Sequence, residues 1–401
     1  MPTLGNATSI HRRVSVDRTR SFAVATFSDV HAFDSQLDGV ARIVGDDPAL
    51  VICFASPLVP RAELIAGVEA MAPGVPMIGC TSSGIVERHG SFGAALQLIV
   101  LGGSGFDARI ALGDYGALGS RDAGRLVGQA VSPHTEGVNR ALLLLSDGLG
   151  GDVAEVVRGA YATAGAGVSI VGGCAGDDLA MERTCQFAGS HQLESGVVAA
   201  ALTSTGPIGI GVEHGWTPVG EPMVVTESEG TSIVALDDRP AMDMYLDAVG
   251  RDLSIVDSAS FARFALTRPL GLTDNKAGHV RFVTGGDLDR RTLEFLVHLP
   301  VGSLVWVMEG SRESVVDATR AAGRQAVSKL DGLDPIGVVA FDCVARRSVI
   351  GDSLVFEETF ALSSTLPEGT PMGGFYTYGE IARTGGPLGL HHQTMVVLAL
   401  G

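Results

Sequence analysis

Continuous apolar runs alternate with amphipathic runs along the chain, and glycine-rich turns separate them. In the first such stretch, residues 49–55 (ALVICFA) are continuously apolar, which is typical of a strand buried on both faces. Residues 60–72 carry apolar side chains at helical spacing after a proline, so they predict a helix. Residues 75–80 (VPMIGC) predict a second buried strand, and residues 94–102 predict a third after a glycine-rich turn.

The same order of elements occurs twice more. The second stretch comprises residues 140–148, 152–165, 168–174 and 195–204, and the third comprises residues 336–343, 356–366, 370–375 and 392–400. A strand–helix–strand connection places its two strands parallel to each other. The last strand returns after a short excursion, so we expect it to pair antiparallel. The sequence therefore predicts an α/β fold in which repeated β-α-β-turn-β units form mixed sheets.

The segment between the second and third repeats has a different pattern, which divides the chain into two lobes. Residues 209–237 alternate and turn like β-hairpins, and residues 312–330 predict a long amphipathic helix. We place the domain boundary where the second repeat ends, so that residues 21–205 and 206–401 form two α/β domains. Residues 1–20 are polar and are expected to be disordered.

The composition limits the classes of function. The formal net charge is −17 and the only lysines are Lys276 and Lys329, which argues against binding to nucleic acid or to anionic membranes. The chain has 401 residues and five cysteines without a CxxC spacing, which excludes a disulfide scaffold or a zinc ribbon and indicates a reducing cytoplasm. No uninterrupted run of about 18 apolar residues is present, so we expect no transmembrane helix.

Several phrases of the sequence occur together in one known family. The N-terminal half contains VPMIGCTSSG, LLLLSDG, VSIVGGCAGDD and HGWTPVG, and the C-terminal half contains ALDDRPAMDMY, RPLGL, FDCVARRSVIG and GFYTYGEI followed by HHQT. In this order they resemble the FIST N and FIST C domains of prokaryotic sensory proteins, over nearly the whole chain. The resemblance implies a signal-input module that binds a small molecule, with amino acids as the ligand class. Its output would pass through a separate signalling protein, such as a histidine kinase.

Polar side chains follow the second strand of each repeat, where a ligand site of an α/β sheet is expected. Ligands of such sheets gather at the carboxyl ends of parallel strands. Hydroxyl and carboxylate groups at this edge suit a small zwitterion. The alternative for the two aspartates is a role in turn hydrogen bonding. The side chains that we expect at the site are Thr81, Ser82, Asp177, Asp178, Tyr376, Tyr378 and Glu380.

Two arginines close to apolar runs are further candidates. Arg281 lies in GHVRFV and Arg346 lies in FDCVARR. An arginine in such a position can hold a carboxylate with two parallel hydrogen bonds. The alternative is that each is a strand-edge arginine that faces water.

Cys80 ends the first of the three glycine-rich strands, and it is either a nucleophile or a small buried thiol. The repeats place Cys174 and Phe375 at what we take to be the same position. A catalytic thiol would not be replaced by phenylalanine, so this series favours packing. We therefore expect no enzyme activity, and an enzyme that uses Cys80 or Cys174 is the alternative.

A haem-based nitric oxide or redox sensor that regulates a histidine kinase is the other alternative that the resemblance implies. A haem site needs an axial histidine and an apolar pocket. His214 in EHGWTPVG and His392 in the HHQT phrase are the candidates for the ligand. The sequence contains no HExxH motif, so we expect no other metal site and, on the favoured interpretation, no cofactor.

Overall fold

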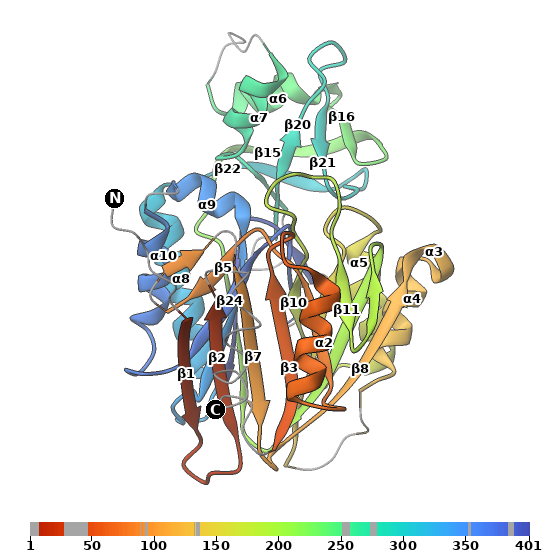
Figure 1. Cartoon of the computed structure of the whole chain (residues 1–401). Coiled ribbons are helices and arrows are strands. Elements are labelled where there is room, and N and C mark those ends of the chain that lie inside the picture. The colour runs from red at the N-terminus through yellow and green to blue at the C-terminus, as the bar shows by residue number, and fades with distance from the viewer. Residues whose placement is uncertain are drawn as a thin grey trace.

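The computed structural model describes residues 8–27, 47–88, 90–92, 95–131, 133, 137–250, 257–272, 279–351, 354–383 and 389–401. Figure 1 shows a large α/β body and, above it, a smaller part made mostly of strands from residues 217–309. In the large body, helices lie on the outside of the sheets, with α8 (Arg312–Ser328), α9 (Val344–Ile350) and α10 (Val355–Ser363) on one side and α3 (Tyr115–Leu118), α4 (Ser120–Gly128) and α5 (Val153–Ala164) on the other.

The first repeat forms a mixed sheet, as predicted. Its elements are β2 (Ser21–Phe27), β3 (Pro48–Ala55), α2 (Arg61–Met71), β4 (Met77–Thr81) and β7 (Leu96–Gly102). The strands on either side of α2 are parallel, because β3 pairs with β4 in that sense. β7 returns antiparallel to β3, and β2 adds antiparallel to β7.

The second and third repeats have the same topology. The strands of the second are β8 (Phe106–Asp114), β9 (Asn139–Ser146), β10 (Ser169–Cys174) and β13 (Gly196–Ser204), and those of the third are β14 (Ile208–Glu213), β23 (Gly337–Cys343), β24 (Met372–Thr377) and β27 (Met395–Leu400). β9–β10 and β23–β24 are the parallel pairs. β13 and β27 return antiparallel to β9 and β23. The prediction of repeated units in mixed sheets is therefore confirmed.

Each repeat also gives a short hairpin to the sheet of another repeat. The hairpins are β5 (Ile85–Glu87) with β6 (Gly90–Phe92), β11 (Gln186–Ala188) with β12 (His191–Leu193), and β25 (Glu380–Arg383) with β26 (Leu390–His391). β5 of the first repeat pairs with β24 of the third, β25 of the third pairs with β10 of the second, and β11 of the second pairs with β4 of the first. The exchange is cyclic, so the three repeats form one closed structure around a common core.

The inner faces of the three sheets pack against one another in this core. Phe54 from the first repeat packs against two aromatic rings of the third, with its ring centroid 4.4 Å from that of Phe375 and 6.4 Å from that of Phe341. Leu145 and Val198 of the second repeat belong to the same buried cluster. Residues that are far apart in the sequence therefore share one apolar interior.

The strand register corrects the predicted equivalence of the glycine-rich strands. In the parallel pairs, Cys80 lies beside Phe54, Gly173 beside Leu145 and Phe375 beside Phe341. Gly173, and not Cys174, is therefore the counterpart of Cys80. The predicted alignment is therefore wrong by one residue for the second repeat and correct for the first and third.

The smaller part is inserted between β14 and α8. Its sheet has the order β19-β18-β22-β15-β16-β21-β20, with β17 beside β16, and α6 and α7 pack on it. Its elements are β15 (Thr217–Glu229), β16 (Ser232–Leu236), β17 (Arg239–Pro240), α6 (Ala241–Ala248), α7 (Ser258–Ala265), β18 (Leu270–Leu272), β19 (His279–Arg281), β20 (Val283–Gly285), β21 (Leu293–Phe295) and β22 (Leu304–Glu309). We call residues 217–309 the inserted sheet.

Part of the segment that we expected to be disordered is a strand. β1 (Thr8–Val14) pairs antiparallel with β2 along its whole length and forms the edge of the first sheet. The expectation is therefore wrong for residues 8–20, where backbone pairing outweighs a polar composition. Residues 1–7 lie outside the described part of the chain.

Candidate functional site

The cyclic exchange brings the turns that follow β4, β10 and β24 together. Backbone N–H groups of these turns donate to carbonyl oxygens at the strand ends of the neighbouring repeat. The three N···O pairs are Ser83 to Tyr376, Gly176 to Thr81 and Tyr378 to Cys174, each at 3.1 Å. We call these six residues the strand-end ring. The predicted meeting of the three turns is thus present, and it forms by backbone hydrogen bonds.

Thr81 and Ser82, which we predicted as ligand contacts, are buried and hold the backbone of neighbouring segments. The Thr81 Oγ1 accepts a hydrogen bond from the Cys185 N–H at 3.0 Å. The Ser82 Oγ donates to the Ala55 carbonyl oxygen at 3.3 Å. These contacts give both hydroxyl groups a structural role in the turn.

Asp177 and Tyr378 form a buried pair between the second and third repeats. The Tyr378 hydroxyl donates to the Asp177 carboxylate and accepts from the Leu179 N–H at 2.9 Å. The same carboxylate accepts from three backbone N–H groups, those of Met181, Glu182 and Arg183. Burial alone would raise the pKa of Asp177, but these hydrogen bonds outweigh it and lower the pKa. Asp177 therefore organises its own turn, as the alternative interpretation held.

Glu380 is fully buried at the start of β25. One carboxyl oxygen accepts from the Thr377 hydroxyl at 2.5 Å and the other accepts from the Thr394 N–H at 3.1 Å. Burial raises the pKa of Glu380 to about 8, although the hydrogen bonds from Thr377 and Thr394 oppose this rise. The predicted role as an exposed ligand contact does not agree with this position, and at neutral pH the group is mainly uncharged.

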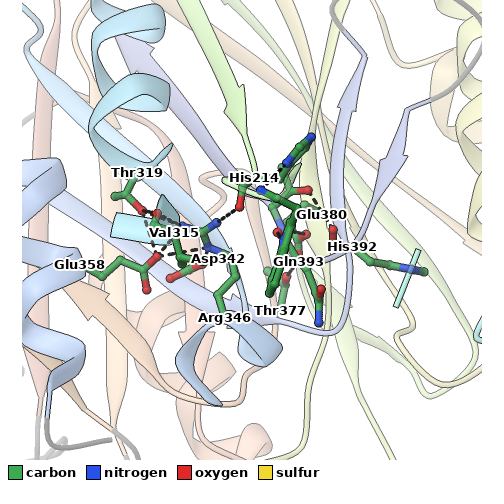
Figure 2. A network of polar contacts seen from close by, with 12 residues as sticks. His214, Val315, Thr319, Asp342, Arg346, Glu358, Thr377, Glu380, His392 and Gln393 are labelled. Atoms are coloured by element: carbon green, nitrogen blue, oxygen red, sulfur yellow. Dashed lines mark hydrogen bonds and ion pairs between the residues drawn. The ribbon is translucent and has the colours of Figure 1, made fainter. Parts of the chain in front are cut away.

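Arg346 is the centre of a buried polar network, which Figure 2 shows. Its Nη2 donates to Glu358 at 2.6 Å, its Nε donates to Asp342 at 3.0 Å, and its Nη1 donates to the His214 carbonyl oxygen at 3.0 Å. Further donors reach Thr319 and the Val315 carbonyl oxygen. All of these hydrogen bonds go to groups inside the protein, so the role of Arg346 is to stabilise the fold. The alternative, an arginine at a strand edge facing water, is wrong because Arg346 is 0% exposed and lies in α9.

Arg281 also lies away from the strand-end ring. It is 5% exposed at the end of β19, where its Nη1 donates to the carbonyl oxygens of Val280 and Leu390, both at 3.0 Å. The alternative of an arginine facing water is therefore wrong here as well. Arg281 borders a different cavity, which is described below.

A cavity of about 400 Å³ adjoins the strand-end ring and combines groups of both charges. We call it the α9 cavity. Its polar lining comes from Ser83, Asp178, Arg347 and Ser348, beside Leu179, Val344 and Gly351. Burial raises the pKa of Asp178, while a hydrogen bond from Ser56 and the positive charge of Arg347 oppose the rise. The volume falls in the range of about 300–1,000 Å³ that is usual for small-ligand pockets.

Arg347 enters this cavity from α9. Its guanidinium carbon lies 5.5 Å from the centroid of the buried Tyr376 ring, a cation–π arrangement, and its Nη1 donates to the Ser83 carbonyl oxygen at 3.4 Å. Tyr376, another predicted ligand contact, thus packs its ring against the guanidinium of Arg347. Of the residues predicted for the site, only Asp178 lines the α9 cavity itself.

Sequence reasoning missed Ser83 and Arg347, and each was one position away from a predicted residue. Ser83 follows Thr81 by two positions, so it shared the signal of the same hydroxyl-rich turn. Arg347 is the second arginine of the ARR phrase. In a helix of 3.6 residues per turn, successive side chains point in different directions, and only the fold tells which arginine faces the interior.

The cysteines have the surroundings of structural thiols. Cys80 is fully buried, and burial raises its pKa well above the ordinary value. Burial has the same effect on the pKa values of Cys53, Cys174, Cys185 and Cys343. A nucleophilic cysteine needs a lowered pKa, so these positions favour the packing interpretation.

The two histidines considered for haem ligation do not share a site of suitable size. His392 is buried beside a cavity of about 60 Å³, and burial lowers its pKa to about 3. Its Nδ1 accepts from the Phe282 N–H at 3.4 Å. His214 instead uses its Nδ1 to accept from the Trp216 N–H at 3.0 Å. The small cavity beside His392 does not fit a haem group, which needs far more room on the open side of its histidine.

Comparison with known proteins agrees with this architecture. Residues 49–239 match the FIST N domain and residues 241–383 match the FIST C domain. The chain belongs to the FIST family. FIST domains are associated with sensing in signal transduction. The FIST N match ends inside the inserted sheet, whereas the sequence pattern placed the boundary between residues 205 and 206.

Relatives of this FIST protein occur in mycobacteria. Two uncharacterized proteins of Mycobacterium tuberculosis, from strains CDC 1551 and H37Rv, are each 24% identical over 390 residues, which covers 92% of this chain and 96% of theirs. An uncharacterized protein of Mycobacterium bovis is 25% identical over 235 residues, which covers 57% of this chain and 59% of its own. No helix in the described part of the FIST chain is long and apolar enough to cross a membrane.

Proposed function

We propose that this FIST protein is a cytoplasmic sensor that binds a small zwitterion, such as a free amino acid, in the α9 cavity. The observation that carries the proposal is the presence of Asp178 and Arg347 on the walls of one cavity of about 400 Å³. The pairing follows from charge. An α-carboxylate would pair with the guanidinium of Arg347, and an α-ammonium group would pair with the carboxylate of Asp178.

The position of the cavity suits a sensory role. Ser83 and Asp178 belong to turns of the first and second repeats, and Arg347 belongs to α9 of the third. A ligand held by these groups would contact all three repeats where the strand-end ring joins them. Its binding free energy would therefore favour one arrangement of the repeats over others.

The proposal includes no catalytic step. The raised pKa values of the buried cysteines support a binding role over nucleophilic chemistry. We propose that the output passes to a separate signalling protein, such as a histidine kinase, as the family resemblance suggests. Slow, equal alkylation of all five cysteines only after unfolding would agree with this view. Rapid alkylation of Cys80 at neutral pH would oppose it.

A thermal-shift screen of the full chain against the common amino acids tests the proposal. We expect at least one amino acid to raise the melting temperature, since a ligand that binds only the folded state stabilises it. Arg347→Gln should remove the shift. Arg324→Gln, which changes an exposed arginine on α8, is the matched control and should keep it. The absence of a shift with every amino acid would contradict the proposal.

A further inference from the structure

Arg281 is a buried cation whose charge is not neutralised by any carboxylate of the described residues. Its Nη1 donates to two carbonyl oxygens, and its Nε and Nη2 donate to no group in the described part of the chain. Burial and, to a smaller extent, the positive charge of Arg158 together lower the pKa of Arg281 to about 10. A buried charge without a partner is costly, so this arrangement calls for an anion.

A second cavity lies beside this arginine. We call it the α5 cavity; it has a volume of about 280 Å³ and is bounded by α5 of the second repeat and by the inserted sheet. Arg158 and His298 accompany Arg281 on its polar side, and Val297, Leu299 and Leu304 form an apolar side. This lining combines positive charge with a short apolar surface.

The other charges at the α5 cavity are already engaged. Asp152 caps α5, because its side chain accepts from the Glu155 N–H at 3.1 Å. Arg158 pairs with Glu155 at 2.5 Å and is partly exposed. Arg281 is therefore the charged group at this cavity that is both deeply buried and without an acidic partner among the described residues.

We propose that the α5 cavity is a second binding site, for a small organic anion with a carboxylate and a short aliphatic chain. The carboxylate accepts two parallel hydrogen bonds, from Nε and Nη2 of Arg281, which lie on the same edge of the planar guanidinium. The aliphatic chain contacts the side of Val297 and Leu299. This site differs from the α9 cavity, with which it shares no lining residue.

The position of Arg281 ties the second site to both parts of the molecule. The arginine comes from the inserted sheet, and its Nη1 reaches the Leu390 carbonyl oxygen on β26 of the third repeat. Nearby, the rings of His279 and His391 stack with centroids 4.8 Å apart across the same junction. A carboxylate on Arg281 would therefore strengthen the contact between the inserted sheet and the body of repeats.

Isothermal titration of the full chain with butyrate, succinate and inorganic phosphate tests this site. We expect saturable binding of butyrate or succinate, and an increase in Kd of at least about tenfold in Arg281→Gln, because a charge-assisted bidentate contact is lost. Arg324→Gln is the matched control, and Arg347→Gln, which alters only the α9 cavity, should also bind normally. The two proposed sites can therefore fail independently.

Ala154→Glu provides a variant that retains the buried Arg281 and its hydrogen bonds to carbonyl oxygens. Ala154 is half-buried on α5 and lines the α5 cavity, so a glutamate there would bring a competing carboxylate on a residue that favours helix. We expect this variant to fold and to lose binding of the small anions. No saturable binding to the unaltered chain up to about 10 mM would overturn the proposal. Equal affinity in Ala154→Glu, or binding of phosphate without either carboxylate, would also overturn it.

Discussion

Arg346 and Arg347 are adjacent on α9, yet the first guanidinium is enclosed by carboxylates and carbonyl oxygens while the second lines the α9 cavity. Burial alone would lower the pKa of Arg346, but the charges of Glu358 and Asp342 outweigh it and raise the pKa. The same two carboxylates need the arginine, because each is 1% exposed. Arg346 thus stabilises the fold, whereas Arg347 lines the cavity of the site that we propose.

Substitution of each arginine should therefore give a different phenotype. Arg346→Gln removes one partner of a buried ionic network, so we expect the free energy of unfolding to fall by about 3–5 kcal/mol. Arg347→Gln should change it by less than about 1 kcal/mol, as is usual for a partly exposed position. Urea denaturation measures both values, with Arg324→Gln as the exposed control. Equal free energies of unfolding for the two variants would show that the buried network around Arg346 does not contribute to stability.

The pairing of Tyr378 with Asp177 predicts a loss of stability in Tyr378→Phe. The substitution removes one donor to the carboxylate and leaves the Leu179 N–H without its acceptor. We expect the free energy of unfolding to fall by about 1–3 kcal/mol, the usual cost of a buried polar group left without a partner. Differential scanning calorimetry would measure the change. Tyr161→Phe is a suitable control. It also removes a tyrosine hydroxyl group, but it keeps the aromatic ring that Tyr161 packs against Arg383.

Glu380 predicts a stability that decreases with rising pH. Its pKa rises from an ordinary value of 4.5 to about 8 in the folded protein, so between these values the folded state holds a proton that the unfolded state has lost. The contribution of Glu380 therefore makes the free energy of unfolding fall as the pH rises from about 4.5 to about 8, with no further change above that range. Glu380→Gln should flatten this part of the curve, which urea denaturation at a series of pH values would show. An unchanged pH profile would place the pKa of Glu380 near its ordinary value.

Gly374 marks a close approach of β24 to β23 that no other residue tolerates. Its φ is +157°, and a Cβ atom there would lie 2.0 Å from the Ala340 carbonyl oxygen. We expect Gly374→Ala to lower the free energy of unfolding by about 1–3 kcal/mol or more, or to prevent folding. Gly285→Ala, at a position with no atom within 4 Å of the added Cβ, should change stability by less than about 1 kcal/mol. A soluble Gly374→Ala variant of normal stability would contradict the register of this strand pair.

The repeated units could be predicted because their signal is local. Continuous apolar runs such as residues 49–55 and 336–343 indicate buried strands, and the intervening helices indicate parallel pairing. The exchange of hairpins could not be predicted, because β5 pairs with β24 nearly 290 residues away and no local pattern specifies that partner. Thr81, Ser82, Ser83 and Glu380 are all buried, and of these four only Ser83 lines the α9 cavity.

The prediction of the site was limited in the same way, because contacts between residues that are distant in the sequence decide which polar side chains face the cavity. Asp178 was found because acidic residues after a strand often face a ligand, and Asp177 has the same sequence signal but an internal role. Asp178 adopts a φ of +56°, and its carboxylate accepts a hydrogen bond from the Ser56 hydroxyl at 3.4 Å instead of from the backbone of its own turn. The position of Arg346 beside an apolar run predicts an arginine close to the interior, but the sequence does not reveal that Asp342 and Glu358 enclose its guanidinium there.

The most direct test of the α9 cavity is a set of titration calorimetry measurements that combines variants with ligand analogues. For an amino acid that stabilises the protein, Kd is measured for the amino acid, for its methyl ester and for its N-acetyl derivative. The proteins are the unaltered chain, Asp178→Asn and Arg347→Gln. Asparagine tolerates the positive φ of position 178, so this change alters the charge and preserves the turn.

We predict that each variant and each analogue lowers affinity by about 10- to 100-fold, the effect of one charge-assisted contact. The losses should not add when the variant and the analogue remove the same contact: the methyl ester should bind Arg347→Gln as it binds the unaltered chain, and the N-acetyl derivative should behave likewise with Asp178→Asn. Fully additive losses in both combinations, or unchanged affinity for the amino acid in both variants, would contradict the assignment of the ligand to these two residues.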